Sequence, residues 1–159
     1  YRRLATETPL PALAARQLGP QHYALRIDYP DGEHRDVEIA GDQWQLDARV
    51  IKWEPRAVML GAPPLYRVER ISGRYIDAAQ ANERRHSIVV LEERNPFDLL
   101  DIKRRFPAWL PWVDADYGSA AYLPLVDGGE YRVSLAPAGG LVARPADART
   151  EQLLHDAGW

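Results

Sequence analysis

The sequence predicts a single domain of the α+β class that is mostly β, an antiparallel meander forming a small barrel or sandwich with one central helix and a short C-terminal helix. Three observations lead to this fold class. Short segments alternate apolar with polar residues, turns rich in Gly and Pro separate these segments, and 46% of the 159 residues are apolar. That apolar content fills one core, and the pattern leaves the choice between barrel and sandwich open.

The beginning of the chain differs from the rest. Residues 1–11 carry two arginines and two prolines without a clear period, so we expect a lead-in tether there. No repeat, low-complexity segment or interior linker divides the remaining residues. The sequence therefore predicts one globular domain over 12–159.

The clearest strand pattern begins after residue 21. Every second residue from Tyr23 to Tyr29 is apolar, which is typical of a half-buried strand. Asp31-Gly32 then predicts a tight hairpin turn, because Asp-Gly adopts the backbone angles that such turns need. Val37 and Ile39 continue the alternation on the return strand.

A turn at Gly41-Asp42 leads into a third arm of the meander, over 43–53. One face of this arm is apolar, and the other carries Gln45, Asp47 and Arg49. This polar stripe fits recognition of a partner strand or an anion. A solvated face with a cross-strand ion pair is the simpler interpretation.

Local signals assign the remaining elements. We expect strands over 65–76 with a bulge at Gly73, over 87–91 with more complete burial, and over 119–125, 130–135 and 141–144. Asn95-Pro96 opens the central helix, in which Leu99, Ile102 and Phe106 follow at helical spacing. The tail over 147–159 predicts the short C-terminal helix.

Composition excludes several classes of function. The 20 Lys and Arg residues against 23 Asp and Glu residues give a formal charge of −3, so no nucleic-acid partner is expected. The absence of cysteine excludes disulfides, thiolate zinc sites and cysteine nucleophiles. The apolar stretches are far shorter than the roughly 20 residues of a membrane-spanning helix.

Recognisable catalytic and cofactor motifs are missing. The four histidines, His22, His34, His86 and His155, lie far apart and outside any metal-binding pattern. No Gly-x-Ser-x-Gly elbow, phosphate loop or dinucleotide-binding motif occurs in the sequence. We therefore expect no catalytic residue, no metal and no cofactor.

The segment around Trp112 is the one local candidate for a binding site. Asp114 and Asp116 could present two carboxylates to a cation such as calcium, but the glycine and distal glutamate of a calcium loop are missing. Trp109, Trp112 and Tyr117 lie close together and could form aromatic walls of a ligand groove, or simply fill the core. We predict Trp112, Asp114, Asp116 and Tyr117 as ligand-binding residues.

Several strings in the chain resemble a known family. They are Tyr-Arg-Arg-Leu-Ala-Thr-Glu-Thr-Pro at 1–9, Gly-Asp-Gln-Trp-Gln-Leu-Asp-Ala-Arg-Val-Ile-Lys-Trp at 41–53, Tyr-Arg-Val-Glu-Arg-Ile-Ser-Gly-Arg-Tyr at 66–75, Pro-Trp-Val-Asp-Ala-Asp-Tyr-Gly-Ser-Ala at 111–120 and Leu-Val-Ala-Arg-Pro at 141–145. They resemble the soluble part of bacterial membrane-anchored proteins catalogued as cation or multidrug efflux pumps.

The resemblance implies a location as well as a class. Anchor helices would precede Tyr1, and the chain would be the extramembrane part of an inner-membrane protein. Arg2-Arg3 beside the anchor favours the cytoplasmic side, although the side stays open. Transport itself would lie outside this chain, because alternating access needs several spanning helices.

Two functions remain as hypotheses. The first is a non-enzymatic domain that recognises a membrane-protein partner or a small molecule, in an oligomeric state that the sequence does not set. The alternative is a hydrolase that uses carboxylates of the Asp114/Asp116 loop together with Asp98 or Asp101.

Overall fold

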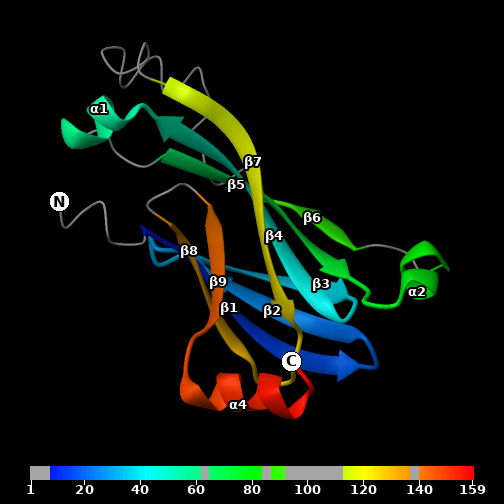
Figure 1. Ribbon diagram of the computed structural model, residues 1–159. Helices are drawn as coiled ribbons and strands as arrows, with labels where there is room; N and C mark the ends of the chain where they lie inside the picture. The colour runs from blue at the N-terminus through cyan, green and yellow to red at the C-terminus, as the bar shows by residue number, and fades with distance from the viewer. Residues whose placement is uncertain (1–7, 62–64, 84–86, 92–112, 137–139) are drawn as a thin grey trace.

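The computed structural model describes residues 8–61, 65–83, 87–91, 113–136 and 140–159, which form a sandwich of two antiparallel sheets (Figure 1). The five-stranded sheet has the order β3 (His34–Ala40), β2 (His22–Asp28), β1 (Thr8–Gly19), β8 (Glu130–Leu135) and β9 (Leu141–Pro145). The four-stranded sheet has the order β6 (Ile88–Val90), β5 (Leu65–Arg74), β4 (Gln43–Trp53) and β7 (Val113–Pro124). The mostly β fold class is confirmed, as a sandwich rather than a barrel.

Side chains, instead of backbone ladders, join the edges of the two sheets. The Ser87 hydroxyl accepts from the Ala40 amide at 2.9 Å beside β6, and the Ser119 hydroxyl accepts from the Leu141 amide at 3.1 Å beside β9. Arg35 also donates to the Val90 carbonyl at 3.2 Å. Within the described residues the sheets therefore stay two separate layers, because these seams lack the paired strands of a barrel.

Strand β1 corrects the part of the expected tether over 1–11 that the structure describes, residues 8–11. It begins at Thr8 and lies at the centre of the five-stranded sheet, between β2 and β8. Leu10 and Leu13 are buried at 5% and 2% exposure, so this segment belongs to the core. Residues 1–7 lie outside the described part of the chain.

The hairpin of β2 and β3 is confirmed as the sequence predicts it. The four apolar residues from Tyr23 to Tyr29 are buried, and β2 pairs with β3 in a regular register. At the turn the Gly32 amide donates to the Tyr29 carbonyl at 3.0 Å, with a positive φ of 91° at Gly32. Glycine adopts that angle without steric cost.

The third arm does not continue the meander. Strand β4 has the predicted bounds, but it pairs with β5 and β7 in the other sheet. Gly41 redirects the chain with a φ of 147°, and a Cβ there would lie 2.7 Å from the Arg74 carbonyl oxygen. The Asp42 amide donates to that same oxygen at 2.7 Å, which fixes the start of β4 against β5.

Gly73 is not the expected bulge. It pairs regularly with Trp44, and the irregularity of β5 falls opposite Asp47 and Ala48. A Cβ on Gly73 would overlap the Ala40 carbonyl oxygen. Glycine is required here because the end of β3 approaches the four-stranded sheet closely.

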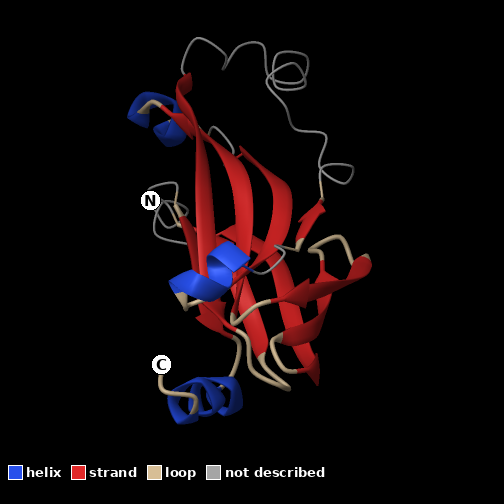
Figure 2. Cartoon of the chain, turned by 90° about the vertical axis from the view of Figure 1, so that its right-hand side faces the viewer, coloured by secondary structure: helices blue, strands red, loops and turns tan. Residues whose placement is uncertain are grey.

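Three helices lie around the sandwich in the described residues (Figure 2). They are α1 (Pro55–Met59), α2 (Ala78–Glu83) and α4 (Ala148–Asp156), of which the sequence predicts only the last. Asp147 caps α4 by accepting from the Thr150 amide at 2.7 Å, and this hydrogen bond lowers the pKa of Asp147. The predicted central helix after Pro96 lies outside the described residues.

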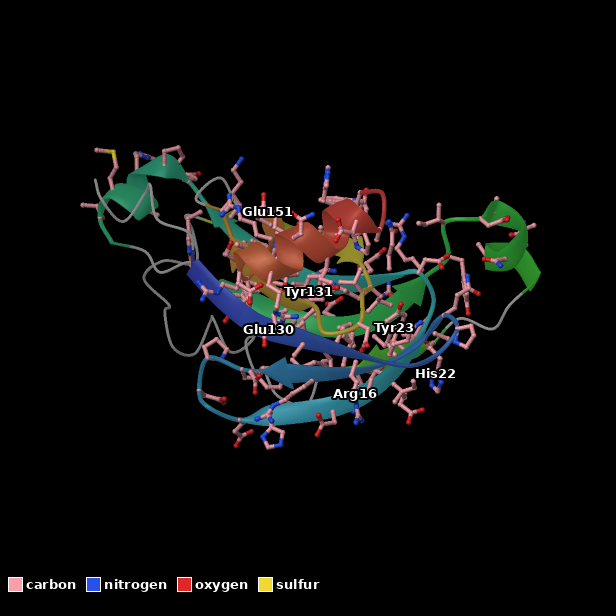
Figure 3. All side chains as sticks on the ribbon, turned by 90° about the horizontal axis from the view of Figure 1, so that it is seen from below. Arg16, His22, Tyr23, Glu130, Tyr131 and Glu151 are labelled. Atoms are coloured by element: carbon pink, nitrogen blue, oxygen red, sulfur yellow. The ribbon has the colours of Figure 1, made fainter. Side chains whose placement is uncertain are left out.

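Trp44 and Tyr131 form the centre of the core between the sheets. Both are 0% exposed, and their rings meet edge to face with centroids 5.4 Å apart. The Tyr131 hydroxyl donates to the Pro124 carbonyl at 2.7 Å and accepts from the Val126 amide at 3.1 Å. Figure 3 views the sandwich from the end that carries α4, with Tyr131 and Glu130 labelled beside this helix.

Burial of Tyr131 predicts a loss of stability at high pH. Desolvation raises the pKa of Tyr131 from 10.0 to about 12, so the folded state keeps this proton longer than the unfolded state does. The free energy of unfolding should be insensitive to Tyr131 below pH 10 and fall by roughly 2 kcal/mol as the pH rises to 12. Urea unfolding across this pH range measures the fall.

The control is Tyr131→Phe. It should cost about 1–3 kcal/mol at neutral pH, because it leaves the Pro124 carbonyl and the Val126 amide without their partner. Its decline above pH 10 should be shallower than that of the wild type. Equal declines would contradict the assignment to Tyr131.

Candidate functional site

The predicted binding residues are placed only in part. Trp112 lies outside the described residues, as does Trp109. Asp114, Asp116 and Tyr117 lie on β7, whose backbone pairs with the end of β4, so they are in a strand and not in a loop. Their side chains are not described, and the ligand-binding role of this group stays a prediction.

The alternative as a hydrolase is likewise untested. Asp98 and Asp101 lie outside the described residues, and so does His86. His22 pairs with Glu38 across β2 and β3 at 3.2 Å, in an exposed position. No group of three or more potential metal ligands occurs in the described part of the chain.

The register of the four-stranded sheet aligns a different set of residues on its outer face. Directly opposed residues in antiparallel strands share one face. The first two rows cross the sheet in the order β6, β5, β4 and β7, and the third begins at β5. The first row is Ile88, Ser72, Gln45 and Tyr122, and the second is Val90, Arg70, Asp47 and Ala120. The third row is Arg67, Arg49 and Gly118. We call these three rows the outer face.

The polar stripe predicted on β4 runs along the middle of this outer face. The Asp47 carboxylate accepts hydrogen bonds from Arg70 Nε at 3.2 Å and from Gln45 Nε2 at 3.1 Å. Because Arg70 lies on the neighbouring strand β5, the expected cross-strand ion pair is confirmed. The Asp47 side chain is only 16% exposed, while that of Arg70 is 53% exposed. The pair therefore holds the arginine in place and still presents it to solvent.

Tyr122 is the large aromatic side chain of the outer face. It is 50% exposed, and the Arg74 guanidinium lies over its ring at 4.3 Å from the centroid. Arg74 stands on β5 and Tyr122 on β7, so this cation–π contact spans β4. The contact orients the ring without burying it.

The margins of the outer face are apolar. On the β6 side Ile88 and Val90 are 56% and 57% exposed, and on the β7 side Ala120 and Gly118 accompany Tyr122. This corrects the expectation that the strand over 87–91 is more fully buried. β6 is an edge strand, and of the segment over 87–91 Leu91, at 1%, lies in the core while Val89 packs against it partly buried.

The charge of the outer face is opposite in sign to that of the whole chain. Three arginines, Arg49, Arg67 and Arg70, lie in its rows with the single carboxylate of Asp47, while Arg74 and Glu69 lie beside them on β5. Glu69 pairs with Arg67 at 3.0 Å. The balance of three against one within the rows is positive, whereas the chain carries a formal −3.

The outer face of the five-stranded sheet has another character. Its register aligns Glu38 with Ala24, Asp36 with Arg26, and Ala14 with Glu130, so carboxylates and arginines alternate between small alanines. Such alternation is typical of a solvated surface. The four-stranded sheet exposes Ile88, Val90 and Tyr122 on its edge strands β6 and β7, whereas the five-stranded sheet exposes Leu18 near the end of β1.

Asp42 marks the end of the sandwich near α2, and its role there is structural. One carboxylate oxygen accepts from Gln21 Nε2 at 2.9 Å and the other from the Ile76 amide at 3.0 Å. Gln21 also donates to Gln80 of α2 at 2.8 Å. Asp42 therefore links the turn between β1 and β2, the turn between β3 and β4, and the segment between β5 and α2.

Comparisons with known proteins add nothing to this site. No family model matches the chain, and neither the curated proteins nor the solved structures contain a match. Within the described residues, no helix is long and apolar enough to span a membrane.

Proposed function

We propose that this domain is a non-enzymatic recognition module that binds a protein partner on the outer face of the four-stranded sheet. The proposal rests on one observation, the row that places exposed Ile88 and Tyr122 at the two margins of a polar stripe. Ile88 and Val90 lie side by side on the exposed face of β6, so they form a contiguous apolar patch, whereas single scattered apolar residues are normal at a protein surface.

The composition of the outer face supports protein binding. Tyrosine and arginine are enriched at the energetically important centres of protein interfaces, and lysine is depleted. The outer face has Tyr122 and four nearby arginines, with no lysine in its three rows. Arg70 and Arg74 are already oriented by Asp47 and Tyr122, which lowers the entropic cost of binding.

The location of the partner follows from the sequence resemblance. A chain similar to the soluble part of membrane-anchored efflux proteins would work beside the bacterial inner membrane, as an extramembrane part. A membrane protein or another anchored chain is then the kind of partner that the outer face meets. Efflux itself would be carried out elsewhere in the assembly.

A photo-crosslinking amino acid at position 122 tests the proposal in living cells. Tyr122 is half exposed, so the replacement should fold and form a specific cross-link with the partner. The matched control is the same amino acid at Arg132, an exposed position on the outer face of the five-stranded sheet. Mass spectrometry identifies the cross-linked chain.

A band that forms at position 122 and not at position 132 supports the proposal. It should also disappear when Ile88→Ser is added, because Ile88 belongs to the same row. Cross-links of equal yield at both positions, or at neither, would contradict a binding role of this face.

A further inference from the structure

The first two rows of the outer face have the same order of apolar and polar residues in both directions across the strands. The first row runs apolar, polar, polar, apolar, from Ile88 to Tyr122. The second row has the same order, from Val90 to Ala120, with a cation and an anion at its centre. These two rows are complementary to the same two rows of a second copy.

A two-fold axis parallel to the strands brings the matching groups together. Such an axis lays β6 of one copy on β7 of the other, and β5 on β4. Ile88 would then pack on Tyr122 of the second copy, and Arg70 would face its Asp47. Each of these contacts occurs twice, because the interface is isologous.

We infer that the partner bound by the outer face is a second copy of this chain, in a face-to-face dimer of the four-stranded sheets. The inference rests on the proposed function and names its partner. Charge complementarity in the second row sets the register, since Arg70 of each copy meets Asp47 of the other. Aligned packing of two sheet faces is an ordinary arrangement in proteins.

The edges of the sheet favour packing by faces over packing by strands. The outward carbonyl of Val90 on the edge strand β6 is occupied by Arg35 at 3.2 Å. The Ser87 hydroxyl beside it is bonded to the Ala40 amide. Side chains that occupy an edge in this way oppose the addition of a further strand.

The size of the outer face makes the dimer weak. Three rows on four strands cover roughly 20 Å in each direction. The resulting area of about 400 Å² is smaller than the about 800 Å² that each partner buries in a standard interface. The third row also places Arg49 opposite Arg67 of the second copy, although Glu69 pairs with Arg67. The dimer should therefore dissociate on dilution.

Two charge reversals test the dimer by sedimentation equilibrium between roughly 5 μM and 1 mM. Asp47→Arg and Arg70→Asp each place like charges together in a homodimer, so each should weaken self-association by about tenfold or more. An equimolar mixture restores both ion pairs as a heterodimer. The mixture should associate within about threefold of the wild type.

Substitutions at exposed positions distinguish a loss of self-association from a loss of folding. Tyr122→Ser should weaken the dimer without changing the fold, while Arg132→Glu on the other sheet should leave the association unchanged. A wild type that stays monomeric at 1 mM, or a mixture no stronger than the single variants, overturns the dimer.

The two proposals fail in different ways. If the wild type is monomeric but the cross-link at position 122 forms with another protein, the dimer is wrong and the recognition face stands. If position 122 forms no specific cross-link and the wild type is monomeric, both are wrong. A cross-link between two copies of the chain supports both.

Discussion

Replacing Trp44 with alanine is expected to lower the free energy of unfolding by about 3–5 kcal/mol. Trp44 is 0% exposed at the start of β4 and packs edge to face on Tyr131. Its removal leaves a cavity between the two sheets that a strand backbone cannot close. Equilibrium unfolding in urea measures the loss, which is a large part of the stability of an ordinary domain.

Trp44→Phe is the informative control. The buried indole Nε1 has no hydrogen-bond partner among the described residues, so phenylalanine removes an unpaired polar group while keeping most of the packing. Its cost should be less than half that of alanine. Tyr122→Ala, at a half-exposed ring, should cost below about 1 kcal/mol. Similar losses for Trp44→Ala and Tyr122→Ala would contradict a core centred on Trp44.

Gly73→Ala is expected to lower the free energy of unfolding by about 2–3 kcal/mol or more, through strain instead of a cavity. The new methyl group would overlap the Ala40 carbonyl oxygen and lie 2.7 Å from the side chain of Ile39. Because the first of these atoms is backbone, β3 and β5 must separate to admit it. Urea unfolding again gives the loss, and proteolysis reports the opened seam.

The neighbouring strand offers a matched control for this substitution. Gly118 lies on β7 of the same sheet, a methyl group added there would meet no atom within 4 Å, and its φ is not positive. Gly118→Ala should therefore be neutral or stabilise the fold by about 0.5 kcal/mol. A loss at Gly118 equal to that at Gly73 would show that the close approach of β3 is not the cause.

Much of the fold can be predicted from the sequence, and its division into sheets cannot. Alternation over 22–28 and 43–53 identifies β2 and β4 and their buried faces, since a strand has a period of two residues. The period says which side of a strand is buried, but not which strand lies beside it. The turn at Gly41-Asp42 therefore predicts a continued meander, whereas the chain passes there to the second sheet.

The outer face shows the same limit. Asp47 and Gln45 are predicted together because they share one strand, where spacing alone places them on one side. Arg70 and Tyr122 join them through the register of β5 and β7 against β4, and the β5 register shifts at an irregularity opposite Asp47 and Ala48. Nothing in the local sequence sets that register.

The predicted burial of β6 is wrong for a related reason. A short apolar run fits a buried strand and an edge strand with apolar side chains equally well. The structure decides, because Ile88 and Val90 project from the edge of the sheet to solvent. The signal available in the sequence is the length of the run, since an edge strand is often short.

The measurement that tests the recognition face most directly is the amide NMR spectrum of the isotopically labelled domain, with and without the chain that cross-links at position 122. We expect the changed signals to belong to the three rows of the outer face on β4, β5, β6 and β7, with β2 and β3 unaffected. For a second copy of this chain, dilution produces the same comparison. Changes confined to the five-stranded sheet or to α4 would contradict a recognition face on the four-stranded sheet.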